Sequence, residues 1–251
     1  MHGLQGKVVV IAGGGAIGAA TAERLVMGGA RVVVGDLDAS HAESLAERLR
    51  EEGGECLGMG FDIADEASVR ELVGRAVTEY GGLDALHANA ADLSIINDDT
   101  NVLDEPLAIF DRTIRVNLRG HWLCTRAALP ELLQRGGGAL IYTSSGAAAM
   151  GEPVRPAYAV SKAGIEALMR HVATHWGKQG VRANAVAPGL VVAPHVLENL
   201  TPEFRDSILR ITRSPRLGRP ADIASMVALL VSDEGEWITG QVLGVNGGSV
   251  I

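Results

Sequence analysis

A tyrosine and a lysine one helical turn apart are the first residues in this 251-residue sequence whose spacing suggests chemistry. Tyr158 and Lys162 stand in the segment YAVSK, and residues four apart share a helix face. A phenol with a pKa of about 10 is a poor base at neutral pH, but a neighbouring ammonium group lowers that pKa. Such a tyrosine can accept the proton of an alcohol while a hydride leaves its carbon. Ser145, at the end of ALIYTSS, can hold the substrate oxygen beside it. The alternative is a solvated pair on a helix surface.

A glycine-rich turn near the N-terminus matches a dinucleotide-binding pattern. Gly13, Gly15 and Gly18 fit Gly-x-Gly-x-x-Gly directly after the apolar run VVVIA. Glycines allow a tight turn and close backbone approach, and the helix beginning near Ile17 presents unpaired N–H groups and its positive dipole end to a pyrophosphate. Taken alone, the pattern fits a turn that only packs a helix on a strand equally well.

An acidic residue at the end of the second apolar run supports the dinucleotide interpretation. Asp36 follows the glycine turn by about 20 residues, where a carboxylate can accept both ribose hydroxyls of an adenosine. The same carboxylate repels a 2′-phosphate, and Leu37 and Asp38 supply no compensating cation. The sequence therefore predicts NAD rather than NADP. Asp62, after the third run, is placed to hydrogen-bond an adenine amino group or to cap the next helix.

Seven short apolar runs alternate with helical patterns along the chain. Their continuous apolar character is typical of parallel strands covered on both faces, joined by helical right-handed crossovers. Helices are expected after Asp38 and Asp65, ending at glycine pairs 53–54 and 81–82. The predicted fold is α/β, a single-domain Rossmann-like doubly wound parallel sheet of about seven strands with helices on both faces. The runs are VVVIA (8–12), RVVVGD (31–36), CLGMGFD (56–62), LDALHANA (83–90), GALIYTSS (138–145), VRANAVAPG (181–189) and GQVLGVNGG (240–248).

The composition predicts one soluble, cytoplasmic domain over residues 1–251. The chain has 47% hydrophobic residues and can bury a large core. A net charge of -8 without a basic cluster argues against nucleic acid as a partner. No apolar run reaches the roughly 18 residues of a membrane span, and glycines interrupt the stretch after Lys7 that superficially resembles a signal peptide. Cys56 and Cys124 are expected as buried free thiols, with no metal site.

The segment 190–215 breaks the alternation and carries three of the nine prolines. Loops at the carboxyl ends of strands line the ligand crevice in such sheets, so we expect a substrate-covering lid here. Its mostly apolar and small side chains predict an uncharged, hydrophobic or cyclic substrate, unless arginines fold inward. His171 and His175 lack a third ligand and are expected on a polar or subunit-facing helix surface. Other candidates near the substrate are Met150, Val154, Arg155, His195, Leu197, Arg205 and Arg210.

Ordered motifs in the rest of the chain complete a family pattern. HANAAD at 87–92, VNLRG at 116–120 and NAVAPGLV at 184–191 precede GRPADIASMVALLVSDEGEWITGQVLGVNGG at 218–248. With YAVSK and the glycine turn, they resemble the short-chain dehydrogenases/reductases, in their roughly 250-residue form, over essentially the whole sequence. The resemblance implies a homotetramer that transfers a hydride between NAD(H) and a small-molecule secondary alcohol or ketone.

The resemblance also implies roles for individual residues. Tyr158 is then the general base or acid, Ser145 positions the substrate oxygen, and Lys162 binds the nicotinamide ribose and lowers the tyrosine pKa. Asn117 completes this tetrad by holding a water in a proton relay. The residues expected to contact the cofactor are Gly13, Gly15, Ile17, Gly18, Asp36, Leu37, Asp62, Ile63, Asn89, Ala90, Ala91, Tyr158, Lys162, Pro188, Gly189 and Val191.

The sequence departs from the family pattern at three places. The glycine loop is one residue shorter than the usual Thr-Gly-x-x-x-Gly-x-Gly, with Ala12 for the threonine and Ala16 for the middle glycine. Ala91 replaces a glycine near the cofactor, and Ala193 replaces a threonine that often touches the carboxamide. Two alternatives are a 3-oxoacyl-thioester reductase, which Asp36 disfavours, and a non-catalytic NAD(H)-sensing or scaffold protein, which the complete tetrad disfavours.

Overall fold

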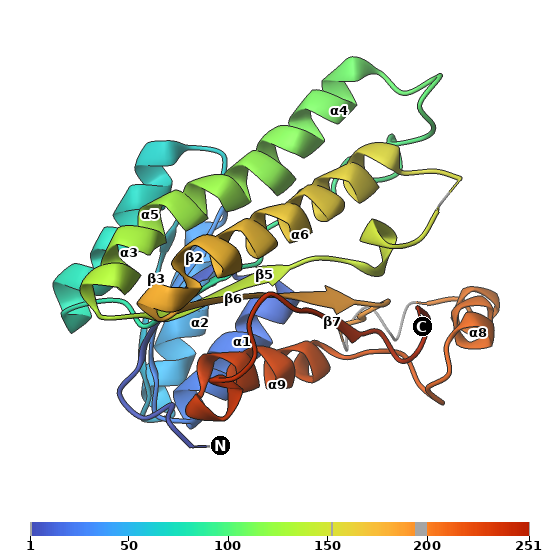
Figure 1. Ribbon diagram of the computed structural model, residues 1–251. Helices are drawn as coiled ribbons and strands as arrows, with labels where there is room; N and C mark the ends of the chain where they lie inside the picture. Colours follow the sequence, from blue (N-terminus) through green and yellow to red (C-terminus); the bar gives the residue numbers. More distant parts are fainter. Residues whose placement is uncertain (1, 152, 194–199, 251) are drawn as a thin grey trace.

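A parallel sheet of seven strands forms the centre of the computed structural model, which describes residues 2–151, 153–193 and 200–250 (Figure 1). The strand order is β3-β2-β1-β4-β5-β6-β7, so the direction of winding reverses between β1 and β4. Ligands bind at such a switch point, outside the carboxyl ends of the strands. The strands are β1 (Val8–Ala12), β2 (Arg31–Asp36), β3 (Glu55–Gly60), β4 (Ala85–Ala88), β5 (Gly138–Thr143), β6 (Val181–Pro188) and β7 (Val242–Val245).

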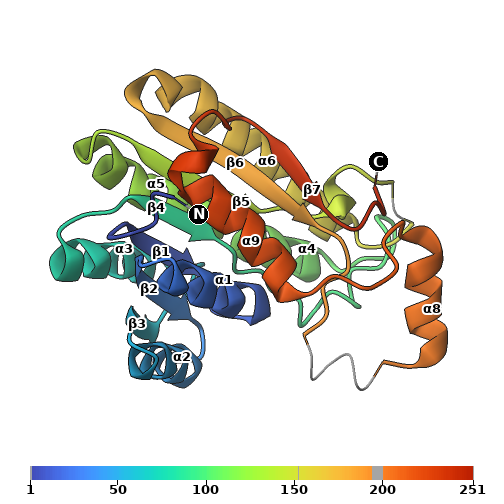
Figure 2. The same cartoon turned by 90° about the horizontal axis from the view of Figure 1, so that it is seen from below.

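Helices cover both faces of the sheet (Figures 1 and 2). Val8 and Val10 of β1 pack toward α3, α5 and α6, while Val9 and Ile11 pack toward α1, α2 and α9. All four side chains are completely buried, which explains the continuous apolar character of the run. The α-helices are α1 (Ala16–Met27), α2 (Ala39–Glu51), α3 (Glu66–Tyr80), α4 (Leu107–Thr113), α5 (Gly120–Gln134), α6 (Pro156–Trp176), α8 (Pro202–Ile211) and α9 (Pro220–Val231).

The predicted caps of two helices are confirmed. The Asp38 carboxylate accepts hydrogen bonds from the first-turn amides of α2, and the Asp65 carboxylate does the same for α3. α3 ends at Gly81, whose φ of 81° is one that glycine adopts without strain. The capping aspartates therefore set where α2 and α3 begin, and Gly81 sets where α3 ends.

Two elements lie close to the carboxyl edge of the sheet. Helices α4 and α5 are joined through the π-helical segment η1 (Ile114–Arg119), which widens the helix at Asn117. Helix α8 stands beyond the sheet (Figures 1 and 2) and has no fully buried residue.

Short 3₁₀ segments are η2 (Gly146–Ala148), η3 (Gly177–Gln179) and η4 (Asp233–Gly235). Within the described parts of the chain, no helix has the length and apolar character needed to cross a bilayer.

Candidate active site

A cavity of about 1130 Å³ opens at the carboxyl ends of the strands. Ligand pockets usually measure about 300–1,000 Å³, so this one has room for a dinucleotide and a second small molecule. Of the predicted site residues, Gly18 and Asn117 are not in its lining. All the other predicted catalytic and cofactor-binding residues line the cavity: Gly13, Gly15, Ile17, Asp36, Leu37, Asp62, Ile63, Asn89, Ala90, Ala91, Ser145, Tyr158, Lys162, Pro188, Gly189 and Val191.

Two glycines of the loop after β1 leave no room for a side chain. Gly13 has a φ of 118°, and a Cβ atom there would lie 2.6 Å from the backbone nitrogen of Ala90. A Cβ atom on Gly18 would lie 1.9 Å from the carbonyl oxygen of Gly13. The loop, the first turn of α1 and the 89–92 turn therefore pack backbone against backbone. Gly18 acts through this packing and not through the cavity wall.

The N-terminus of α1 faces the cavity. The helix begins at Ala16 with Gly15 as its N-cap, and no side chain caps it. Gly15, Ala16 and Ile17 all line the cavity. The first amides of a helix lack intrahelical partners and carry the positive dipole end, which suits a pyrophosphate. The shortened loop, with Ala16 in place of a glycine, thus still forms a cradle that fits a dinucleotide.

Asp36 is bonded to the glycine loop itself. Its carboxylate accepts hydrogen bonds from the Gly14 amide at 2.8 Å and from the Asp38 amide at 3.0 Å. The His41 ring nitrogen Nε2 contacts the Gly14 carbonyl oxygen at 3.1 Å. The end of β2 and the start of α2 therefore hold the shortened loop from both sides. A carboxylate has about four acceptor positions, so Asp36 keeps capacity for the predicted ribose hydroxyls.

The residues predicted at the adenine end have different environments. Leu37 is exposed, whereas Ile63 is buried. The Asp62 side chain accepts a hydrogen bond from the Ala64 amide at 2.8 Å. Because Asp65 caps α3, the alternative role of Asp62 as the cap of that helix is wrong. Asp62 instead closes a tight turn after β3, with its exposed side chain at the cavity wall.

A series of hydrogen-bonded polar groups connects the ends of three strands, and no motif in the sequence predicted it. Asn89 Nδ2 donates to the Gly13 carbonyl at 2.9 Å, and Thr143 Oγ1 donates to Asn89 Oδ1 at 2.9 Å. His87 Nε2 lies 2.9 Å from Thr143 Oγ1. Burial lowers the pKa of His87 to about 3, so the ring is neutral. Because Thr143 donates its hydroxyl proton to Asn89, His87 Nε2 is the donor to Thr143 Oγ1. This series of hydrogen bonds fixes the glycine loop relative to β4 and β5.

Tyr158 and Lys162 lie together on α6. The Lys162 Nζ atom is 5.6 Å from the centroid of the Tyr158 ring and donates to the Thr143 carbonyl at 2.8 Å. The lysine side chain is 1% exposed, and burial lowers its pKa to about 8. The ammonium form therefore still predominates at neutral pH. This places a positive charge beside the phenol ring of Tyr158.

Ser145 enters the cavity from the end of β5. Its backbone is extended, and its hydroxyl oxygen accepts a hydrogen bond from the Ala147 amide at 3.2 Å as the N-cap of η2. Ser145, Tyr158 and Lys162 line the same cavity. That common wall can hold an alcohol or carbonyl oxygen between a hydroxyl donor and a phenol.

Asn117 lies behind the cavity, on the widened turn of η1. Its side chain is completely buried, and Oδ1 accepts a hydrogen bond from the Asp92 amide at 2.8 Å. Within the described part of the chain, its Nδ2 atom has no hydrogen-bond partner. The side chain thus anchors the turn that carries Ala90 and Ala91.

Several apolar side chains line the cavity beside the predicted site residues. Helix α8 contributes Phe204, Ile208 and Ile211, which recur at helical spacing. Leu93, Ile96 and Met150 line the cavity as well, and so does Arg155, whereas Val154, Arg205 and Arg210 do not. The candidates His195 and Leu197 lie outside the described residues.

The two histidines of α6 pack with an aromatic side chain. His171 and His175 stack with ring centroids 5.8 Å apart, and both rings meet Trp176 edge-on. No set of three metal-ligating side chains gathers anywhere in residues 2–151, 153–193 and 200–250.

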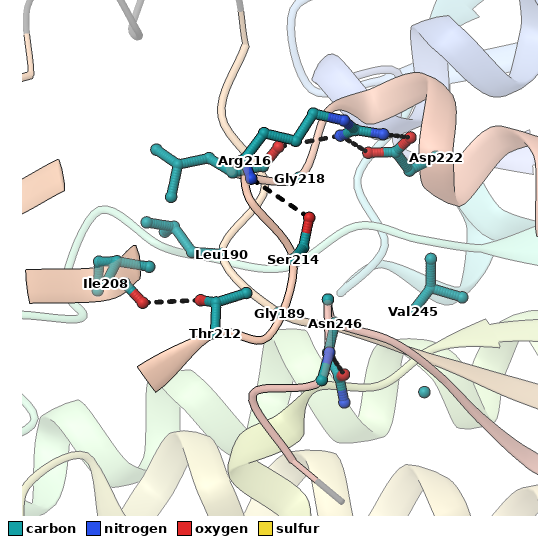
Figure 3. Close-up of a pocket in the computed structure, with 14 residues that line it drawn as sticks. Gly189, Leu190, Ile208, Thr212, Ser214, Arg216, Gly218, Asp222, Val245 and Asn246 are labelled. Carbon is teal, nitrogen blue, oxygen red and sulfur yellow. Dashed lines mark hydrogen bonds and ion pairs between the residues drawn. The ribbon is translucent and has the colours of Figure 1, made fainter. Parts of the chain in front are cut away.

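A second cavity of about 310 Å³ lies behind α8 (Figure 3). Gly189, Leu190, Ile208 and Thr212 line both cavities. On its far wall, the Arg216 guanidinium forms two hydrogen bonds with the Asp222 carboxylate, at 2.7 and 2.8 Å (Figure 3). This ion pair secures the connection between α8 and α9, and thereby the apolar helix that faces the main cavity.

Known proteins match this chain along its whole length. The family model described as Enoyl-(Acyl carrier protein) reductase matches residues 11–249. A Bradyrhizobium diazoefficiens protein described as "Probable short-chain type dehydrogenase/reductase" is 40% identical, covering 99% of this chain and 89% of that protein. The cis-4-hydroxycyclohexanecarboxylate dehydrogenase of Sinomonas cyclohexanicum is 36% identical, covering 96% of each.

A solved structure matches the fold. The structure of a 7α-hydroxysteroid dehydrogenase in complex with NADH and 7-oxo glycochenodeoxycholic acid has a TM-score of 0.89 at 32% identity. The match covers 98% of this chain and 95% of that one. The family model, the related sequences and the matching structure all lead to the same conclusion: the chain belongs to the short-chain dehydrogenases/reductases.

Proposed function

We propose that this protein is an NAD(H)-dependent oxidoreductase that interconverts a secondary alcohol and its ketone. The observation that carries this proposal is the shared cavity, in which the Tyr158 phenol beside the buried Lys162 ammonium faces the same space as the glycine loop and Asp36. A proton acceptor and a dinucleotide cradle in one enclosure are the two parts that alcohol oxidation requires.

The roles of the catalytic side chains follow from their positions. NAD⁺, when bound, supplies the hydride acceptor. In the oxidative direction, the Ser145 hydroxyl holds the alcohol oxygen and the Tyr158 phenolate removes its proton. The Lys162 ammonium stabilises that phenolate, and its link to the Thr143 carbonyl keeps it in place. In reduction, the Tyr158 phenol returns the proton to the forming alkoxide.

Asp36 supports NAD(H) over NADP(H). Its carboxylate is fixed by two backbone amides at the wall where an adenosine ribose would lie. A 2′-phosphate placed there would meet a like charge that cannot turn away without breaking both hydrogen bonds. The complex of the related 7α-hydroxysteroid dehydrogenase contains NADH, in agreement with this choice.

The substrate class that fits best is an alicyclic secondary alcohol. Phe204, Ile208 and Ile211 of α8 contribute apolar surface to the cavity that Ser145 and Tyr158 also line. Two relatives are named for alcohols on rings, one a hydroxysteroid and one a hydroxycyclohexane. Both of those compounds also carry an acid group, and Arg155 lines this cavity. An uncharged ring next to α8 is therefore compatible with an acidic substituent near Arg155.

The same proposal includes a single domain that assembles as a homotetramer in the cytoplasm. The support for assembly is a set of exposed apolar side chains on helices that contact α6 or belong to it: Phe110 of α4, Trp122 of α5 and Val160 of α6. Large apolar patches on soluble proteins commonly mark subunit contacts. Light scattering of the protein and of Trp122→Glu tests this part, since a tetramer that uses these side chains dissociates in the variant.

A panel of secondary alcohols tests the proposed reaction. Cyclohexanol, cis-4-hydroxycyclohexanecarboxylate and a 7α-hydroxysteroid are each supplied with NAD⁺ or NADP⁺, and absorbance of the reduced cofactor is followed. An acyl-thioester ketone with NADH or NADPH tests the 3-oxoacyl alternative. The expected result is NAD⁺ reduction by a ring alcohol. A clear preference for NADP(H), or activity confined to the thioester, would contradict the proposal.

A further inference from the structure

The helix that carries Tyr158 begins without a capping side chain of its own. Arg155 occupies the N-cap position with a φ of 67° and makes no side-chain cap hydrogen bond. Tyr158 is the third residue of α6, so its amide is one of the first-turn donors that an α-helix cannot satisfy internally. An acceptor from elsewhere in the chain is required at this buried end.

Asp99 supplies that acceptor from a distant loop. Its carboxylate receives hydrogen bonds from the Tyr158 amide at 2.8 Å and from the Ala157 amide at 3.2 Å. Its own carbonyl oxygen accepts from the Arg155 amide at 3.0 Å. Asp99 is 3% exposed. A buried carboxylate at the positive end of a helix dipole is held strongly, so the start of α6 is fixed to this one side chain.

The loop that carries Asp99 also forms part of the substrate wall. It connects β4 to α4, and its residues Leu93, Ser94 and Ile96 line the cavity. In the same loop, burial and the negative charge of Asp99 raise the pKa of the Glu105 carboxyl. The loop thus joins the substrate wall to the catalytic helix.

We propose that Asp99 is a positioning residue for the reaction, which sets the place of the Tyr158 hydroxyl by holding the backbone of that residue. This inference rests on the proposed oxidoreductase function. Its consequence is that loss of the Asp99 carboxylate lets the first turn of α6 fray and moves the phenol relative to the substrate oxygen. A displacement of about 1 Å in an active site can cost about 100-fold in rate. The cofactor cradle of β1 and β2 does not depend on Asp99.

The test compares Asp99→Ala with a matched control, Asp65→Ala. Asp65 caps α3 through two backbone amides in the same way, but α3 carries none of the tetrad. With the best substrate of the panel, Asp99→Ala is expected to lower kcat at least 30-fold. The Kd for NADH, measured by fluorescence, is expected to stay within twofold of wild type. Asp65→Ala is expected to lower Tm comparably and to keep kcat within twofold.

Two results would overturn the inference. One is a kcat of folded Asp99→Ala within threefold of wild type. The other is an equal loss of kcat in Asp99→Ala and Asp65→Ala, which would mean that loss of any cap lowers activity. If Asp99→Ala does not fold, Asp99→Asn decides, since asparagine keeps one acceptor oxygen: at least a fivefold fall in kcat supports the inference, and a value within twofold overturns it. An inactive wild type would instead contradict the proposed function.

Discussion

Replacing Lys162 by methionine has a pH-dependent effect on stability that can be worked out from its burial. The side chain is 1% exposed, and its pKa falls from 10.5 to about 8 because burial disfavours the ammonium form. The folded apo protein therefore contains a charge that would be better solvated in the unfolded chain. The substitution removes this charge and also the hydrogen bond to the Thr143 carbonyl.

The magnitude follows from the shift of about 2.5 pH units at about 1.4 kcal/mol each, or roughly 3 kcal/mol. Below pH 8 Lys162 is protonated in both the folded and the unfolded wild type, so the full cost of burying its charge lowers the stability of the fold. Between about pH 8 and 10.5 the unfolded state binds more protons than the folded state, so wild-type stability rises with pH. The methionine variant lacks this contribution, and the lost hydrogen bond adds an offset that does not vary with pH.

The assay is urea unfolding of apo Lys162→Met and its parent at pH 7, 8, 9 and 10. Both proteins carry Tyr158→Phe, so that the phenol does not titrate beside the lysine. The free energy of unfolding of the parent should gain about 2.5 kcal/mol relative to the methionine variant from pH 7 to pH 10. The argument that burial lowers the pKa of Lys162 would be refuted if the difference in unfolding free energy between the two proteins stayed constant within about 0.5 kcal/mol over this pH range. A change in the opposite direction would refute it as well.

Two further experiments test the cofactor cradle. Asp36→Ala combined with Leu37→Arg should raise the ratio of kcat/KM for NADP⁺ to kcat/KM for NAD⁺ by about 10–100-fold, because it removes a like charge and adds a cation. Steady-state kinetics with both cofactors measure this ratio. An unchanged ratio would contradict the role of Asp36. Gly18→Ala should destabilise the protein by about 2–3 kcal/mol, since its Cβ would collide with the Gly13 carbonyl. Gly74→Ala, in open space on α3, should stabilise it by about 0.5–1 kcal/mol. Thermal unfolding that ranks the two alanine variants in the opposite order would contradict this.

The elements of the fold could be predicted because their signals are local. The apolar runs gave all seven strands, and Asp38 and Asp65 marked the starts of α2 and α3. Strand ends were less accurate: the run at 83–90 contains a strand only from Ala85 to Ala88, because the residues after it turn into the cavity wall. Apolar character continues through such a wall and does not mark the end of a strand.

Local sequence patterns were enough to predict most of the residues that share the cavity, but not the hydrogen bonds between them. Tyr158 and Lys162 were found because their pairing is set by helix periodicity. The bonds from Gly14 to Asp36 and from Thr143 to Asn89 join residues 22 and 54 positions apart, and depend on strand register that no local pattern encodes. Asp99 lies in a loop without periodicity and has its partners 58 and 59 positions away. Only the three-dimensional structure relates such residues.

The central claim is that the Tyr158 hydroxyl transfers the proton in an NAD(H)-dependent alcohol–ketone interconversion. Its most direct test is the kcat of Tyr158→Phe for the best alcohol of the panel, measured together with the Kd for NADH. We expect kcat to fall by at least about 1,000-fold, in line with the loss of a general base, while NADH binding stays within a few-fold of wild type. A Tyr158→Phe variant that keeps a tenth or more of wild-type turnover would contradict the assignment.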